Sequence, residues 1–407
     1  IFGVVGIWKF RKANPILWFI MIQWLLAVGT FILIDLEIVS HVIYVLSYFL
    51  STIFFIFGVA IYWNYSTIKT AYKIFWNKNI SIDRVSVRIT VKVIAIISII
   101  ITILYYNATG INFFISIVTG NIIEDYTTSR LATYSGDKYY FPGYVNQFKN
   151  VMLPLCFSVL LAWAWYSKSK IKSWSLFFFG FPFLLYALLG TGQRAFLVYA
   201  YFASFLGISI LTKIPKKIKY FIGLIALSIF SVFTFYYKSL DLSSPSIYYS
   251  VFIEIFKRIF FYQQEGGLIG FNYIYNLEIT WFKEWFQGLV GILPGIQGSD
   301  IDHRIHAIMY GSHRGTVPLS FVGSSYHNGG ILNVISISFI VGWVYSLIYH
   351  RLLCGSRYIS RCFLYGALFF YLSILPLGSP ISMINNGVVT LLILLFLRKF
   401  DYPTIIK

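Results

Sequence analysis

The chain has 407 residues, of which 58% are hydrophobic and only 11% are charged, and its mean hydropathy is +0.75. A soluble globular protein is nearer half apolar and a quarter charged, so this composition excludes a soluble enzyme and a disordered protein. Aromatic residues make up 20% of the chain, which suits the interfacial belts of a membrane protein and surfaces that stack on sugar rings. The cysteines Cys156, Cys354 and Cys362 have no paired spacing and predict neither a disulfide framework nor a thiolate metal site.

Ten apolar stretches are candidates for spanning helices, since a helix that crosses a bilayer needs roughly 17 to 25 mostly apolar residues. They are residues 16–34, 41–63, 91–106, 151–167, 174–190, 195–211, 220–237, 331–349, 362–378 and 383–397. Several are at the short end of that range. We therefore predict an all-α polytopic membrane protein of about ten transmembrane helices, with residues 1–407 forming a single integral membrane domain.

The net charge of +18 could indicate nucleic-acid binding, but the positions of the basic residues favour another explanation. When ten spans are assumed, every strongly basic loop falls on one side, which carries 22 of the 32 Lys and Arg and only two of the 14 Asp and Glu. Cytoplasmic loops carry such an excess, so both termini are predicted to be cytoplasmic. The basic residues then serve orientation and contact with anionic lipid, and no nucleic-acid partner is expected.

Two external loops, 107–150 and 238–330, are much longer than a connection between helices requires. Such long loops usually carry function, and the second is too rich in aromatic and aliphatic residues to be disordered. Within it, Tyr248–Tyr262 and Trp281–Leu293 mix apolar with charged residues and are predicted to be amphipathic helices lying at the outer membrane–water interface. The second loop is therefore the place to look for chemistry.

Histidines and acids gather near the end of the second loop. Four of the six histidines lie between residues 303 and 327. Candidate proton acceptors are His303, His306, His313, His327, Asp300, Asp302 and Glu265. The two aspartates with His303 and His306 are a loose match to a metal site, and no second histidine pair at helical spacing supports one, so we expect no metal and no other cofactor.

Arginines are the natural ligands for an anion in this setting, because a guanidinium pairs with phosphate oxygens through two parallel hydrogen bonds and never loses its charge. Arg194 stands in the short external turn Thr191-Gly192-Gln193-Arg194, at bilayer depth and with no acid nearby in the sequence. The second loop adds Arg258, Arg304 and Arg314. These four arginines predict a site for a lipid-linked pyrophosphate, although each could instead be a surface charge or part of an interhelical ion pair.

His327 is the leading candidate for the base because it lies where the loop meets the next span, beside two glycines that permit close approach. The alternative for this residue is a structural role, such as a hydrogen bond to a backbone carbonyl. Asp302 and Glu265 are the reserve candidates for the base. Tyr326, Asn328 and His313 are predicted to position the substrate.

Several short motifs, in this order and on this side of the membrane, resemble the bacterial lipid-linked oligosaccharide polymerases of the O-antigen polymerase (Wzy) type. The Thr191–Arg194 turn resembles the Gly-Ser/Gln-Arg turn of that family, and Lys257-Arg258-Ile259-Phe260 resembles its arginine–aromatic segment. Arg304 followed by Gly315 is similar to an arginine–glycine spacing of its external loops. The stretch from Gly315 to Ile331 resembles its Gly-Thr…Gly-Glu-x-Tyr-x-Asn-x-Gly signature, but with Ser324 and Ser325 where an acid often stands.

The resemblance covers residues 191–331 and the overall topology, and it implies a function. The protein would polymerise undecaprenyl-pyrophosphate-linked repeat units into O-antigen or a related surface polysaccharide, by block transfer at the periplasmic face of the inner membrane. It would be a metal-independent glycosyltransferase whose fold resembles that of integral-membrane glycosyltransferases using polyprenyl-phosphate donors. Implied partners are the lipid-linked donor and acceptor, membrane lipid and a co-polymerase that regulates chain length.

Two alternatives use much of the same chemistry. An O-antigen ligase would transfer the same donor glycan to the lipid A core. A transporter or flippase would move lipid-linked oligosaccharide without forming a bond, but the predicted spans hold few ionisable groups that could line a central pathway.

Overall fold

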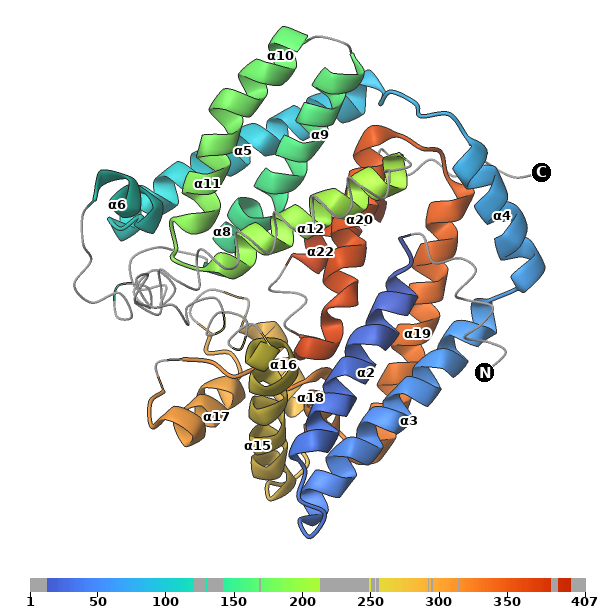
Figure 1. The fold of residues 1–407 in the computed structure, drawn as a ribbon, viewed down its shortest axis with the longest axis vertical. Coiled ribbons are helices and arrows are strands. Elements are labelled where there is room, and N and C mark those ends of the chain that lie inside the picture. Colours follow the sequence, from blue (N-terminus) through green and yellow to red (C-terminus); the bar gives the residue numbers. More distant parts are fainter. Residues whose placement is uncertain are drawn as a thin grey trace. The chain divides into compact units, whose positions relative to one another are not determined.

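The computed structural model describes residues 13–120, 129, 142–167, 170–212, 249, 253, 256–291, 293, 296–313, 315–381 and 387–396. The described residues form helices and no strand, apart from a single parallel bridge between Ser81 and Tyr358 (Figure 1). The helices up to residue 211 are α2 (Pro15–Leu33), α3 (Val39–Tyr62), α4 (Tyr65–Asn77), α5 (Val85–Thr109), α6 (Phe113–Thr119), α8 (Pro142–Gln147), η1 (Phe148–Met152), α9 (Leu153–Tyr166), α10 (Lys170–Ser175), η2 (Leu176–Gly180), α11 (Phe181–Leu189) and α12 (Arg194–Leu211). The later helices are η3 (Arg258–Tyr262), α15 (Gln263–Tyr275), α16 (Lys283–Val290), α17 (Ile301–Tyr310), α18 (Phe321–His327), α19 (Gly330–Cys354), α20 (Ile359–Ser373), η4 (Leu375–Leu377) and α22 (Val388–Phe396).

Seven helical segments are long and apolar enough to cross a membrane, and each coincides with a predicted span. They are Pro15–Leu33, Val39–Tyr62, Val85–Thr109, Tyr144–Tyr166, Ile171–Leu189, Gly330–Cys354 and Ile359–Leu377. The prediction of an all-α membrane protein is thereby confirmed. Of the other three predicted spans, 195–211 is a shorter apolar helix, 220–237 lies outside the described residues, and 383–397 is described only at 387–396.

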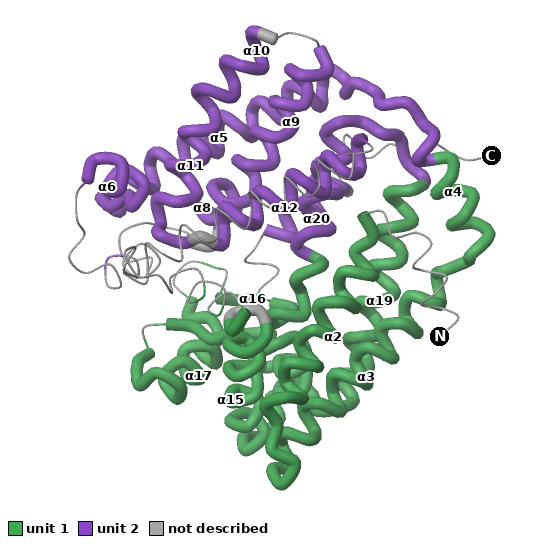
Figure 2. The backbone as a smooth tube through the Cα atoms, viewed as in Figure 1, with its two compact units in different colours: residues 1–74, 231–353, 372–383 green, residues 75–230, 354–371, 384–407 purple. Residues whose placement is uncertain are grey.

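The chain forms two compact units, which are coloured separately in Figure 2. Unit 1 comprises residues 1–74, 231–353 and 372–383, and unit 2 comprises residues 75–230, 354–371 and 384–407. Unit 1 thus contains α2, α3, α15–α19 and η4, whereas unit 2 contains α5–α12, α20 and α22. The chain passes from unit 1 to unit 2 and back more than once.

Aromatic stacking and polar pairing join α2, α3 and α19 in unit 1. The ring of Phe19 stacks on Phe55 at 4.1 Å between centroids, and both meet the edge of Tyr345. Nearby, the Ser51 hydroxyl accepts hydrogen bonds from the Gln23 amide at 2.9 Å and the Ser338 hydroxyl at 2.8 Å. These bonds satisfy polar groups that lipid could not, and they fix the register of three helices.

Helices α3 and α19 also touch backbone to backbone. A Cβ built on Gly58 would lie 1.9 Å from the carbonyl oxygen of Phe339, and one built on Gly342 would lie 2.0 Å from that of Phe55. Each helix therefore uses a glycine where the other's main chain approaches, the pattern of small residues at membrane helix interfaces.

Unit 2 ties its polar groups together at the ends of helices. The buried Asp83 carboxylate accepts hydrogen bonds from the Trp163 indole at 2.7 Å and from the amide and hydroxyl of Ser360. The buried Arg357 guanidinium donates to the carbonyls of Lys78, Ile210 and Leu211. Cations are favoured at such carbonyls because a helix carries partial negative charge at its C-terminus.

We expect Gly58→Ala and Gly342→Ala each to cost about 1–3 kcal/mol of stability, since the added methyl group must push two packed backbones apart. Thermal unfolding of the purified protein in detergent measures this. The control is Gly298→Ala, where the nearest atom to an added Cβ is 3.8 Å away, an ordinary contact. Unchanged melting of both α3 and α19 variants would contradict the close approach.

Candidate functional site

Several residues predicted from the sequence to carry chemistry lie on two short helices of unit 1, α17 and α18. A third short helix, α16, is hydrogen-bonded to α18, and all three precede the long helix α19. None of these three short helices is among the segments long enough to cross a membrane. Figure 1 shows them in yellow to orange, beside α15. The candidate site is built from their side chains.

Asn328 is the centre of the arrangement. It is fully buried, and its amide nitrogen donates to a Glu284 carboxylate oxygen at 2.7 Å and to the Ser324 carbonyl at 2.9 Å. Its amide oxygen accepts from the Trp285 backbone N–H at 3.1 Å, and the Thr280 hydroxyl lies 3.2 Å from the same oxygen. Because these contacts engage both ends of the amide, its direct role is to hold the start of α16 against the end of α18.

A second polar chain runs alongside this clamp. The Trp285 indole donates to the Ser324 hydroxyl at 2.8 Å, and that hydroxyl donates to Ser379 at 3.0 Å. Ser324 is one of the two positions where the resembling family often has an acid. The structure instead brings a carboxylate to the Tyr326–Asn328 stretch from another helix, through Glu284.

Glu284 and Trp285 were missed by the sequence analysis, which treated the stretch from Trp281 to Leu293 only as an interfacial helix. A helix, α16, does form within this stretch, and Phe286 and Leu289 on it are exposed, as are Trp281 and Phe282 just before it. Its place at the membrane interface stays a prediction. Both Trp281 and Phe282 have positive φ, at 48° and 68°. Positive φ is uncommon for aromatic residues, so their exposed rings sit on a strained turn held by the hydrogen bond from the Phe282 N–H to the Asn328 carbonyl at 3.0 Å.

Asp302 is the most perturbed carboxylic acid of the site. Burial raises its pKa to about 6, and the nearby Glu284 carboxylate adds to the rise. The N–H of Leu319 donates to its side chain at 3.2 Å and opposes the shift, as does His303. Two carboxylates with one pKa near neutral are a frequent feature of acid–base sites.

His303 and His306 form hydrogen bonds to the backbone of the segment that follows α17. The Nδ1 of His303 lies 2.8 Å from the Gly315 carbonyl, and that of His306 lies 2.6 Å from the Ser312 carbonyl. Since a carbonyl only accepts, each Nδ1 carries a proton and donates it. A Cβ on Gly315 would clash with the His306 ring, so the Arg304–Gly315 spacing reflects the folding of this segment onto α17.

Arg304 lies at the exposed edge of α17, with 52% of its side chain accessible to solvent. Its Nε donates to Asp300, one turn earlier, at 2.8 Å, and it also forms a hydrogen bond with Tyr273 of α15. An exposed pair of this kind adds little stability, but it holds the guanidinium in place while leaving other donors in solvent.

His327 is the last residue of α18 and is only 5% exposed. Its carbonyl accepts from the Thr280 N–H at 2.9 Å, and its buried Nδ1 has no hydrogen-bond partner among the described residues. Burial lowers its pKa, and Glu284 partly offsets this shift. The imidazole is therefore neutral at neutral pH and close enough to Glu284 to sense its charge.

The remaining predicted residues are more dispersed. Tyr326 is half-buried and packs its ring against Phe271 at 4.9 Å. His313 is exposed, and its carbonyl faces His303 at 3.2 Å. Glu265 is exposed in the first turn of α15 and has no hydrogen-bond partner within the described part of the chain.

For three of the four predicted arginine ligands, the structure does not describe the side chain. Arg314 is outside the described residues, as are the side chains of Arg194 and Arg258, whose backbones begin α12 and η3. The prediction that the four bind one anion therefore stays a prediction. Among the residues that are described, no group of three His, Cys, Asp or Glu could hold a metal ion.

Comparisons with protein-family models, characterised proteins and solved structures give no match for this chain. Its candidate site must therefore be interpreted from its own chemistry. The described residues place the Asp302 carboxylate and the buried, neutral His327 imidazole near the Glu284 carboxylate, while Arg304 is paired with Asp300 on the exposed edge of α17. The first three groups can accept and hold a proton.

We expect Asn328→Ala to lower the free energy of unfolding by about 1–3 kcal/mol, because it leaves the Glu284 carboxylate and the Trp285 N–H without their buried partner. Thermal unfolding in detergent measures the loss. The matched control is Asn276→Ala, which removes one exposed hydrogen bond to the Asn272 carbonyl. Equal melting of the two variants would show that Asn328 does not hold α16.

Proposed function

We propose that this protein is a membrane glycosyltransferase that polymerises undecaprenyl-pyrophosphate-linked repeat units by block transfer at the outer face of the bacterial inner membrane. The observation that carries the proposal is Asp302, a partly buried carboxylic acid with a pKa of about 6 that senses the charge of Glu284, the same carboxylate that acts on the buried His327. Arg304 stands two residues further along α17.

In the proposed reaction the donor glycan is already activated by its pyrophosphate, so the protein needs to supply a base and a place for the leaving charge. The ionised Asp302 carboxylate takes the proton from a hydroxyl of the acceptor repeat unit. The freed oxygen attacks the anomeric carbon of the donor, and the bond from that carbon to the pyrophosphate oxygen breaks. Undecaprenyl pyrophosphate leaves with the bonding electrons.

The leaving pyrophosphate gains negative charge as the bond breaks. Arg304 supports this step, since it carries a fixed positive charge at the rim of the site. Glu284 serves through its charge, which helps to keep the Asp302 pKa high. The exposed rings of Trp281 and Phe286 suit contact with lipid tails or sugar faces. His327, the leading base in the sequence analysis, remains the second candidate for proton acceptor.

The acceptor distinguishes this proposal from its closest alternative. A ligase would use the same leaving group and the same base but transfer the glycan to the lipid A core. A purified protein given only one synthetic lipid-linked repeat unit can form a polymer ladder if it is a polymerase, whereas a ligase or a transporter cannot. If purified protein that is folded forms no ladder from this repeat unit, the proposal is rejected.

The pH profile tests the base. The carboxylate must be ionised to accept a proton, so wild-type ladder formation should fall as the pH drops through about 6, the pKa of Asp302. Asp302→Asn should remove this fall in rate, the acidic limb of the pH profile, and should slow the reaction by about 100- to 10,000-fold. Quantified ladders between pH 5 and pH 8 measure both effects.

Two comparisons sharpen this result. Glu278→Gln, at an exposed acid between α15 and α16, should keep both the rate and the limb. His327→Gln should keep the limb if Asp302 is the base. Loss of the limb in His327→Gln, with its retention in Asp302→Asn, would transfer the role to His327.

The proposed topology places α16–α18 outside and the basic loops inside. A cysteine introduced at the exposed Gln297 should react with a membrane-impermeant maleimide in spheroplasts, whereas one at the exposed Lys69 of α4 should react only after permeabilisation. Mass shifts on denaturing gels report the labelling. The reverse pattern would reject the topology and, with it, transfer at the outer face.

A further inference from the structure

Unit 2 holds a buried positive charge that the proposed site does not use. Lys149 is fully buried at 0% exposure, within the apolar segment Tyr144–Tyr166. Its ammonium donates to the Asn150 amide oxygen at 2.7 Å. No carboxylate of the described residues pairs with it. An ionisable side chain at membrane depth is costly, and such residues are usually retained for function.

Aromatic rings surround the ammonium in place of a counter-charge. Its nitrogen lies 5.1 Å from the ring centroid of Tyr105, 5.9 Å from that of Tyr106 and 5.5 Å from that of Phe196. Ring faces attract a cation and so favour the charged form. They do not neutralise its charge, which leaves the site electrically open to an anion.

The local backbone is also unusual. Lys149 lies in η1, a π-helical turn between α8 and α9, and such turns are frequent at functional sites. Phe196, one of the three rings, belongs to the first turn of α12, whose N-terminus has no side-chain cap. The free N–H groups of a helix N-terminus favour negative charge, so the lysine and the helix attract the same kind of ligand.

The turn before α12 supplies a further polar group. A Cβ on Gly190 would lie 2.5 Å from the Tyr106 ring, so this turn packs against the same ring that faces Lys149. The next residue, Thr191, is fully buried, and its hydroxyl has no hydrogen-bond partner among the described residues. A buried hydroxyl without a partner is expected to find one, which a bound ligand would provide.

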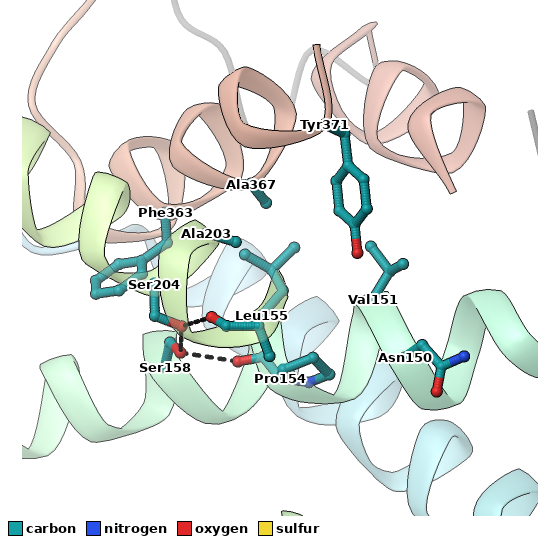
Figure 3. Close-up of a pocket in the computed structure, with 11 residues that line it drawn as sticks. Asn150, Val151, Pro154, Leu155, Ser158, Ala203, Ser204, Phe363, Ala367 and Tyr371 are labelled. Atoms are coloured by element: carbon teal, nitrogen blue, oxygen red, sulfur yellow. Dashed lines mark hydrogen bonds between the residues drawn. The ribbon is translucent and has the colours of Figure 1, made fainter. Parts of the chain in front are cut away.

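Two hollows of unit 2 approach this lysine. Tyr106 lines one of them, with Asn107, Asn112 and Tyr186. Asn150 lines the other, a small hollow; Figure 3 shows its mainly apolar walls from η1, α9, α12 and α20, with the Tyr371 hydroxyl pointing inward. The two routes to the ammonium therefore pass Tyr106 or Asn150, each of which lines a hollow and contacts the lysine.

We propose that Lys149, with the Thr191 turn and the N-terminus of α12, forms a phosphate-binding subsite in unit 2. The ligand class is a phosphate or pyrophosphate group, either free or carried by a prenyl lipid. This inference deepens the proposed function, on which it rests for the identity of the ligand. Within unit 2 it gives a phosphate group a ligand, Lys149, that the arginine prediction did not include.

The test is thermal unfolding of the full chain in detergent, with inorganic pyrophosphate or farnesyl pyrophosphate at matched ionic strength. Wild type should be stabilised, and Lys149→Met should weaken pyrophosphate binding by about ten- to a hundredfold, the usual effect of losing a charged hydrogen bond. Lys149→Gln, which keeps the bond to Asn150, should lose binding equally and decides the case if the Met variant fails to fold. Lys172→Met, at an exposed lysine of α10, should bind as wild type does.

A larger shift with farnesyl pyrophosphate than with pyrophosphate would identify the lipid-linked form as the ligand, and equal shifts would identify the free anion. No shift in wild type, or an undiminished shift in both Lys149 variants, would overturn the subsite. The ladder assay separates the two proposals. A shift lost with Lys149 in a protein that forms no ladder would keep the subsite and reject the polymerase, whereas normal ladders and shifts from the Lys149 variants would reject the subsite alone.

Discussion

Lipid offers no hydrogen bonds, so every polar group that enters the apolar layer must find its partner within the chain. This constraint explains why the described residues are helical and why their polar side chains occur in connected sets. Gln23, Ser51 and Ser338 join α2, α3 and α19 through two bonds in an apolar environment. Where the backbones of α3 and α19 meet directly, the residues are glycines, Gly58 and Gly342, which have no side chain to separate them. Packing and polar satisfaction thus select the same helix register.

The same constraint acts on the candidate site, where it separates residues that hold the structure from residues that are available for chemistry. Asn328 uses both ends of its amide to join α16 to α18. His303 and His306 donate their Nδ1 protons to carbonyls of the segment that follows α17. The Nδ1 of His327 and the buried Ser325 hydroxyl are unpaired within the described part, and burial raises the pKa of Asp302 to about 6. The proposed acid–base role of Asp302 and His327 thus draws on groups that the fold does not fully satisfy.

The sequence predicts what depends on local pattern. Long apolar runs predict spans because length and hydrophobicity are properties of neighbouring residues, and seven such runs are helices of sufficient length. The Glu284–Asn328 hydrogen bond joins residues 44 positions apart, and no periodic pattern in the sequence predicts it. The amphipathic pattern of Trp281–Leu293 indicates a charged face but not that its one acid, Glu284, turns toward Asn328. Lys149 was hidden for the opposite reason, because one lysine in an external loop resembles any solvated charge until its burial is known.

Comparison with other buried charges shows why Lys149 stands apart. The Asp83 carboxylate has three donors, from Trp163 and Ser360, and the Arg357 guanidinium has three backbone carbonyls to donate to. In both cases the partners come from separate segments of unit 2, so the charge contributes to holding these segments together. The Lys149 ammonium has three protons to donate, and among the described residues only the adjacent Asn150 amide accepts one. Because that amide belongs to the next residue, the bond joins no distant segments, and a purely structural role would be served as well by an apolar side chain. What the ammonium does provide is a positive charge that no described carboxylate pairs, close to the first turn of α12, whose N-cap residue makes no side-chain hydrogen bond. That is a reason to bind an anion and not a reason to fold.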